Sequence, residues 1–196
     1  MSYSAHVDRF AAERLPPRAQ WPEFRFDLPE LQYPERLNAA VALIDRAVDE
    51  GHGNRLALVS ETARLTYAEL KDRSDRIARV LVDDGLVPGG RVLLRGHNTA
   101  MLFATWAGVL KAGGIAVTTM PMLRAGELAT IAERARVTHA IVDARTADDW
   151  TATARFIMQL PVRVRVVGPP YRIDSSRRIW GGDRSRAAPL CGRFPR

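Results

Sequence analysis

The histidines and the single cysteine of this 196-residue chain are the first residues to examine for metal or acid–base chemistry. His6, His52, His97 and His139 are too far apart to match a metal-ligand spacing, and Cys191 alone supplies no thiolate set. Only His97 follows an apolar run of strand length, where a loop that faces a ligand is expected. We therefore predict no metal site, and the role of His97 stays open.

Carboxylates and serines give no catalytic arrangement either. The adjacent acids 83–84 and 148–149 point in different directions on a helix, so neither pair forms a general acid and base, and we expect them to be solvated. Ser60 and Ser74 lack the G-x-S-x-G setting of a hydrolase nucleophile. The sequence thus predicts no catalytic, cofactor-binding or metal-binding residue within the chain.

Residues 65–119 have the pattern of an alternating α/β unit, which we expect to position the rest of the chain. Thr66 and Glu69 have the spacing of a capping box, and positions 70, 74, 77 and 81 form one face of the helix that follows. Residues 91–95 are an apolar run typical of a buried parallel strand. Asn98 or Thr99 caps a second helix at 101–111, and residues 115–119 form the next strand. Gly113-Gly114 lies between a helix end and a strand, so it stops the helix and does not cradle a phosphate.

The flanking segments extend this α/β pattern. We predict a helix at 37–48 capped by Asn38, a strand at 56–59 joined to residue 65 by a hairpin, a helix at 124–136, a strand at 139–142 and a helix at 147–158. The alternation favours a mainly parallel sheet covered by helices. Ligands bind at the carboxyl ends of such strands, which places the loops 96–98, 119–122 and 143–146 there.

Two motifs resemble those of the adenylate-forming enzymes, the family of acyl-CoA ligases, luciferases and peptide-synthetase adenylation domains. LTYAEL at 65–70 is similar to the first, and LKAGGIAVTTMP at 110–121 to the second, with Lys111, Ala112 and Gly113 as its Lys-Ala-Gly. The segments 15–24, 28–38 and 119–128 resemble the aryl-CoA ligases, of the 2-aminobenzoate and benzoate types. The resemblance covers residues 7–149 and implies an incomplete N-terminal subdomain of the adenylate-forming fold.

The parts that carry catalysis in this family are missing. There is no phosphate loop of the form TSGTTGxPKG, and the chain's two lysines, Lys71 and Lys111, do not follow a glycine loop. The resemblance implies that an intact relative uses ATP, Mg²⁺ and CoA to activate a small aromatic acid. We expect this chain to bind none of the three and to be inactive alone.

Composition and charge together divide the chain into three segments. These are a Pro- and aromatic-rich arm at 1–35 packed on the body, the partial ligase subdomain at 36–160, and an Arg-rich tail at 161–196. The net charge of +7 arises entirely in the tail, because residues 1–160 carry 20 basic and 20 acidic side chains. Residues 162–167 form a last edge strand, and beyond Gly168 we expect disorder. The arginine-rich composition also fits a gene read out of frame from near residue 161.

Location and partners follow from the same composition. One cysteine and the lack of a long apolar run predict a cytoplasmic protein without a membrane span. Two other functions stay open. A free-standing α/β module for a nucleotide or small acid has no visible site in the sequence. The second is nucleic-acid binding by the tail, which interleaves Tyr171 and Trp180 with arginines 177, 178, 184 and 186. We do not expect this binding.

Overall fold

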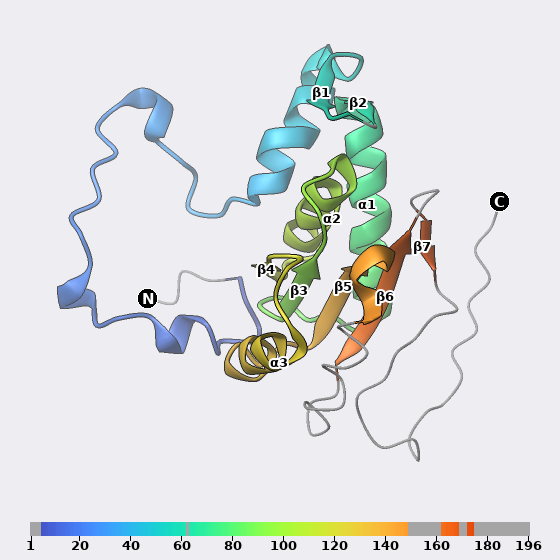
Figure 1. Cartoon of the computed structure of the whole chain (residues 1–196). Coiled ribbons are helices and arrows are strands. Elements are labelled where there is room, and N and C mark those ends of the chain that lie inside the picture. Colours follow the sequence, from blue (N-terminus) through green and yellow to red (C-terminus); the bar gives the residue numbers. More distant parts are fainter. Residues whose placement is uncertain (1–4, 62, 149–161, 169–171, 175–196) are drawn as a thin grey trace.

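A five-stranded sheet with the order β4-β3-β5-β6-β7 is the centre of the fold (Figure 1). This computed structural model describes residues 5–61, 63–148, 162–168 and 172–174. The strands are β3 (Arg91–Arg95), β4 (Ile115–Thr119), β5 (His139–Asp143), β6 (Arg163–Gly168) and β7 (Arg172–Asp174). The first four are parallel and β7 runs antiparallel to β6, which confirms the mainly parallel sheet.

Helices cover both faces of this sheet because the strand side chains alternate between two apolar layers. On one face Val92, Leu94 and Ile141 pack under α1 (Tyr67–Asp83) and α2 (Ala100–Lys111). On the other, Leu93 and Val142 join the apolar layer that includes residues of α3 (Ala125–Arg134). Both faces of the central strands are therefore buried.

The predicted capping box at the start of α1 is present. Glu69 donates its backbone N–H to Thr66 Oγ1 at 3.2 Å, and the Glu69 carboxylate accepts the Thr66 N–H at 2.8 Å. Thr99 caps α2 by accepting from the Leu102 N–H at 3.2 Å, which settles the choice between the two predicted caps. At the other end of α2, Gly113 takes a φ of +76°, the helix stop expected from its position.

Replacing Thr66 by alanine is expected to lower the free energy of unfolding by about 1 kcal/mol, because the first turn of α1 loses its cap. Urea unfolding followed by far-UV circular dichroism measures the change. Thr130→Ala is the matched control: Thr130 is exposed within α3 and donates only to the Gly126 carbonyl. Equal stabilities for the two variants would contradict a role for the cap.

The segment before the sheet forms the predicted helix and hairpin. Asn38 caps the helix by accepting from the Ala40 N–H, and the helix continues as two π-type stretches, η4 (Val41–Asp45) and η5 (Val48–His52). Gly51, with a φ of +84°, departs from helical geometry within η5. The strands β1 (Leu56–Val59) and β2 (Arg64–Thr66) then pair antiparallel, as expected.

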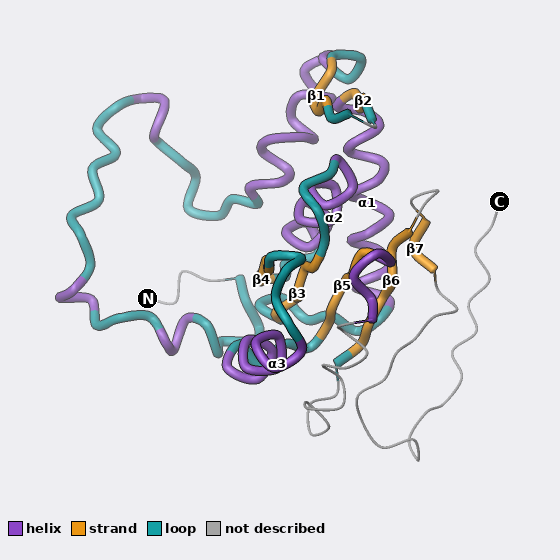
Figure 2. The backbone as a smooth tube through the Cα atoms, in the orientation of Figure 1, coloured by secondary structure: helices purple, strands orange, loops and turns teal. Residues whose placement is uncertain are grey.

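The N-terminal arm contacts the body only near its start. Val7 and Asp8 donate backbone N–H groups to the Pro88 carbonyl at 2.9 Å, and the Asp8 carboxylate lies 2.5 Å from Arg91 Nη1. Beyond this contact the chain runs away from the body, with only the short turns η1 (Ala12–Arg14), η2 (Arg18–Gln20) and η3 (Pro29–Leu31) (Figure 2).

The prediction of an arm packed on the body is confirmed at its start, where the guanidinium groups of Arg91 and Arg136 lie 4.7 Å from the Phe10 ring centroid. It is wrong for the later aromatic residues, which contact one another. Trp21, Phe24, Phe26 and Tyr33 form a row of consecutive ring contacts with centroids 6.1–6.2 Å apart. The last three of these side chains are more than half exposed. The rings therefore pack on one another, in a segment where the prolines disfavour regular helix and strand.

The tail differs from its prediction at two points. The strand predicted at 162–167 forms, but it is not at the edge, because β7 pairs outside it. The expected disorder beyond Gly168 is wrong for Arg172–Asp174, the strand β7. The rest of the tail, including Tyr171, Trp180 and the tail arginines from 177 onward, lies outside the described residues, as does most of the helix predicted at 147–158.

No helix in the described ranges is both long enough and apolar enough to cross a membrane.

Candidate ligand-binding site

A cavity of about 80 Å³ opens at the carboxyl ends of β3 and β5. The connection from β3 leads through α2 to β4 on one side, whereas β5 is followed by β6 on the other. Adjacent strands whose connections leave in opposite directions create a crevice, and this is where open α/β sheets bind ligands. The polar lining residues are Arg95, His97, Thr99, Thr105, Asp143 and Arg145, and the apolar ones are Met101, Leu102, Ile141 and Val167.

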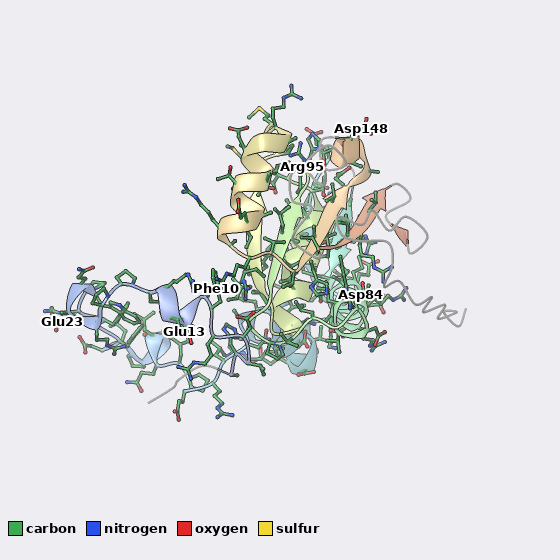
Figure 3. The ribbon with its side chains drawn as sticks, turned by 90° about the horizontal axis from the view of Figure 1, so that it is seen from below. Phe10, Glu13, Glu23, Asp84, Arg95 and Asp148 are labelled. Carbon is green, nitrogen blue, oxygen red and sulfur yellow. The ribbon has the colours of Figure 1, made fainter. Side chains whose placement is uncertain are left out.

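Arg95 fixes the geometry of this end of the sheet. Its side chain is 1% exposed at the end of β3, and its guanidinium donates to the carbonyls of Leu123 at 2.7 Å and Pro121 at 2.8 Å. Figure 3 shows Arg95 and Asp148 at one end of the strands, with Phe10 toward the other. Arg95 therefore holds the β4–α3 loop in place while it lines the cavity.

Asp143 and Arg145 form the charged rim. Arg145 donates to the Asp143 carboxylate from Nε at 3.0 Å and from Nη2 at 2.6 Å. Burial by itself raises the pKa of Asp143, but the hydrogen bonds and charge of Arg145, with a smaller contribution from His97, outweigh it and hold the pKa below its ordinary value. The rim is therefore charged at neutral pH.

Two of the three loops predicted to face a ligand meet at this cavity. Gly96 and His97 come from the first, and Asp143 and Arg145 from the third. The loop 119–122 does not line the cavity, although Arg95 binds it. Sequence reasoning missed Arg95 and the start of α2. The signal in the sequence that could have identified Arg95 is a charged residue at the end of an apolar strand.

Both lysines of the chain lie in one ionic cluster. Lys111 at the end of α2 donates to Asp75 at 2.6 Å and also to Asp45, and Lys71 donates to Asp75 at 2.7 Å. Burial raises the pKa of Asp75, but the two lysines outweigh it and keep that pKa lowered. The cluster joins η4, α1 and α2. These lysines are engaged in the fold and do not fit the phosphates of ATP.

The expectation that residues 83–84 are both solvated is wrong for Asp84. Its carboxylate accepts from Arg165 Nε of β6 at 2.6 Å and also from Nη2. Asp84 follows the last residue of α1, where a carboxylate is unfavourable, so the guanidinium compensates both the carboxylate and the helix end. His139 lies beside it, with Nε2 3.4 Å from the Asp84 carbonyl. Asp148, the other described acid, lies at the opposite end of the sheet (Figure 3).

The free energy of unfolding should decrease as the pH is lowered, because of His139. Burial and the charges of Arg163 and Arg165 lower the pKa of His139 from 6.5, although the Asp84 carbonyl partly opposes this. The unfolded chain therefore binds the proton first, and stability falls as pH drops below 6.5 toward the folded-state pKa.

The variant His139→Gln should be less sensitive to pH over this range, because glutamine does not titrate. Urea unfolding at pH 7.5 and 5.5 measures the difference for both proteins. If His139→Gln shows the same difference in unfolding free energy between the two pH values as the wild-type chain, His139 is not the cause of that difference.

In the described part of the chain, no group of three or more histidine, cysteine and acidic side chains is arranged to hold a metal ion. His52 lies in η5 and His97 at the cavity, so the structure does not bring the histidines together. Gly113 and Gly114 form the end of α2, as predicted, through N–H groups that donate to the Leu110 and Val109 carbonyls.

The parallel sheet, its two helical layers and the crevice at its switch point define an open α/β subdomain. Residues 44–177 match the family model described as AMP-binding enzyme. This chain therefore belongs to the AMP-binding, adenylate-forming family, and the match continues beyond residue 161. A change of reading frame near residue 161 stays a prediction from the sequence.

Several known proteins are similar to the chain. A salicylyl-CoA synthase / salicylate adenylyltransferase from a Streptomyces species is 37% identical over 111 residues, which cover 56% of this chain and 20% of the relative. Triostin synthetase I from Streptomyces triostinicus is 33% identical over 134 residues, covering 67% of this chain and 25% of the relative. The chain thus spans a quarter or less of these curated relatives.

Solved structures agree on the fold. Apo MatB from Rhodopseudomonas palustris superposes with a TM-score of 0.60 at 25% identity, over 69% of this chain and 26% of that protein. A benzoate CoA ligase from Burkholderia xenovorans LB400 gives a TM-score of 0.61 at 23% identity, over 69% and 27%. The second similarity concerns the fold alone.

Proposed function

We propose that the chain is the N-terminal part of an ATP-dependent aryl-CoA ligase. Such an enzyme joins an aromatic carboxylate to CoA through an acyl-adenylate, releasing AMP and pyrophosphate. The observation that carries the proposal is the family match at 44–177, supported by a relative named for salicylate and by the aryl-ligase segments of the sequence. The benzoate or 2-aminobenzoate type is our narrower proposal.

Within that enzyme this segment supplies scaffold. Its two lysines are held in the ionic cluster, and none of the described residues forms a glycine-rich loop between a strand and a helix. ATP, Mg²⁺ and CoA would be bound by residues outside this chain, so we derive no catalytic step from the residues present. A cytoplasmic location stays a prediction from composition.

Pyrophosphate exchange into ATP tests the proposal, because it reports acyl-adenylate formation directly. The chain alone should give no exchange with benzoate, salicylate or 2-aminobenzoate. The DNA downstream of the codons for residue 177 should encode a TSGTTGxPKG-type loop in one of the three frames. Exchange by the isolated chain would contradict the proposal, as would the absence of that loop from all three frames.

A further inference from the structure

We propose that residues 6–10 form a latch, which closes over the amino ends of β3 and β5 and opens as a unit while the sheet stays folded. Opening the latch releases the N-terminal arm from one of its two attachments to the body. Figure 3 shows Phe10 against the body, with Glu13 and Glu23 farther out along the arm. The latch belongs to this chain alone and does not depend on the ligase assignment.

The backbone of the latch lies against the turn at 88–90, just before β3. Val7 and Asp8 both donate their N–H groups to the Pro88 carbonyl at 2.9 Å. Gly89 has a φ of +87°, and a Cβ atom there would overlap the Asp8 carbonyl oxygen and lie 2.7 Å from the Cβ of His6. The latch can therefore close in this position only over a glycine.

An ion pair holds the side-chain part of the latch. The Asp8 carboxylate accepts the Phe10 N–H at 2.9 Å and lies 2.5 Å from Arg91 Nη1. The Arg91 side chain is 5% exposed, and its guanidinium also donates at 2.9–3.0 Å to the carbonyls of Gly89, Ala135 and Arg136. The Asp8 carboxylate therefore supplies negative charge to a buried guanidinium whose other partners are neutral oxygen atoms.

Three guanidinium groups surround the Phe10 ring. The guanidinium carbon lies 3.7 Å from the ring centroid in Arg14, and 4.7 Å from it in both Arg91 and Arg136. Arg136 has a φ of +48°, a conformation that residues other than glycine rarely adopt. With this backbone, the Arg136 carbonyl accepts from Arg91 while the Arg136 side chain reaches the ring. One strained residue thus contributes two contacts to the closed latch.

The latch is packed loosely enough to open. Asp8 and Phe10 are only partly buried, whereas every residue of β3 is buried. A cavity of about 420 Å³ is lined by these two latch residues and by Glu133, Val137 and Thr138. A segment with few buried apolar contacts opens at a lower free energy than the whole domain. We therefore expect the latch to open without unfolding of β3.

The far end of the arm stays attached when the latch opens. Asn38 donates from Nδ2 to the Leu110 carbonyl at 2.7 Å, which ties the arm to the end of α2. Between these attachments, the hydrogen bonds that residues 11–36 make in the described part of the chain join residues of the arm to one another. The aromatic rings from Trp21 to Tyr33 therefore move with the arm once the latch is open.

Amide hydrogen exchange of the full isotope-labelled chain, followed by NMR, tests the proposal. The N–H groups of Val7 and Asp8 should exchange at least about tenfold more slowly than in an unstructured peptide, because both are hydrogen-bonded. They should exchange at least about tenfold faster than the N–H groups of β3, and with a weaker dependence on urea. Equal exchange in the latch and β3 would overturn the proposal, and so would exchange at the rate of an unstructured peptide.

Gly89→Ala should open the latch, because the added methyl group overlaps the Asp8 carbonyl. Exchange at Val7 and Asp8 should then reach the rate of an unstructured peptide, while β3 stays protected. Gly51→Ala is the matched control: Gly51 also has a positive φ, of +84°, but no atom lies within 4 Å of an added Cβ. It should leave exchange in the latch unchanged. Wild-type exchange in Gly89→Ala, or an equal change in both variants, would overturn the proposal.

A second pair of variants tests the ring contacts, and it decides the question even if Gly89→Ala fails to fold. Phe10→Leu keeps an apolar side chain but removes the ring, so it should speed exchange at Val7 and Asp8 by about three- to tenfold. Phe10→Tyr keeps a ring face and should exchange like the wild type. If leucine holds the latch as well as tyrosine does, the guanidinium–ring contacts do not close it and the proposal is wrong.

Discussion

Replacing Lys111 by methionine is expected to lower the free energy of unfolding by about 2–3 kcal/mol. The Lys111 side chain is 6% exposed and lies between the carboxylates of Asp45 and Asp75. Methionine fills a similar volume without charge, so the two acids face each other across the contact between η4, α1 and α2. Their repulsion and incomplete hydration cause the loss.

Lys71→Met is the matched control for this cluster. Lys71 contacts the same two acids, but its side chain is 32% exposed, so its loss should cost less than about 1 kcal/mol. Urea unfolding at pH 7 measures both variants. If both variants lose the same stability, burial of Lys111 is not what makes the cluster stabilising.

Replacing Asp84 by asparagine is expected to cost about 2–3 kcal/mol, because it leaves the Arg165 guanidinium without its carboxylate. The two side chains are 13% and 10% exposed, so water compensates little. Asp83→Asn is the control: Asp83 is the exposed neighbour at the end of α1. The difference between the two variants in urea unfolding isolates the ion pair from any effect on the helix end.

The same experiment tests whether β6 is a native part of the sheet. A segment translated out of frame has no reason to place an arginine opposite Asp84 or to bury Val164 and Val166. If Asp84→Asn is as harmless as Asp83→Asn, Arg165 does not hold β6 against α1.

Local signals predicted most of the fold. Thr66 with Glu69, Asn38 and Gly113 act within one turn of chain, and each took the predicted role. The position of the cavity was also predictable, since it depends only on which strand ends are adjacent.

The failures involve partners distant in sequence. Asp84 reads as a solvated acid because its partner lies 81 residues away in β6. The position of β6 inside the sheet depends on β7, which is a short strand in an arginine-rich segment. The aromatic residues of the arm were expected on the body, but nothing local indicates that they would contact one another.

One chimera tests the central claim most directly. The described segment, through Gly168, replaces the matching part of the Streptomyces salicylyl-CoA synthase, and pyrophosphate exchange into ATP is measured with salicylate. If this chain is the N-terminal part of an aryl-CoA ligase, the chimera should fold and exchange pyrophosphate in a salicylate-dependent manner. A folded chimera without exchange, beside an active parent enzyme, would contradict that claim.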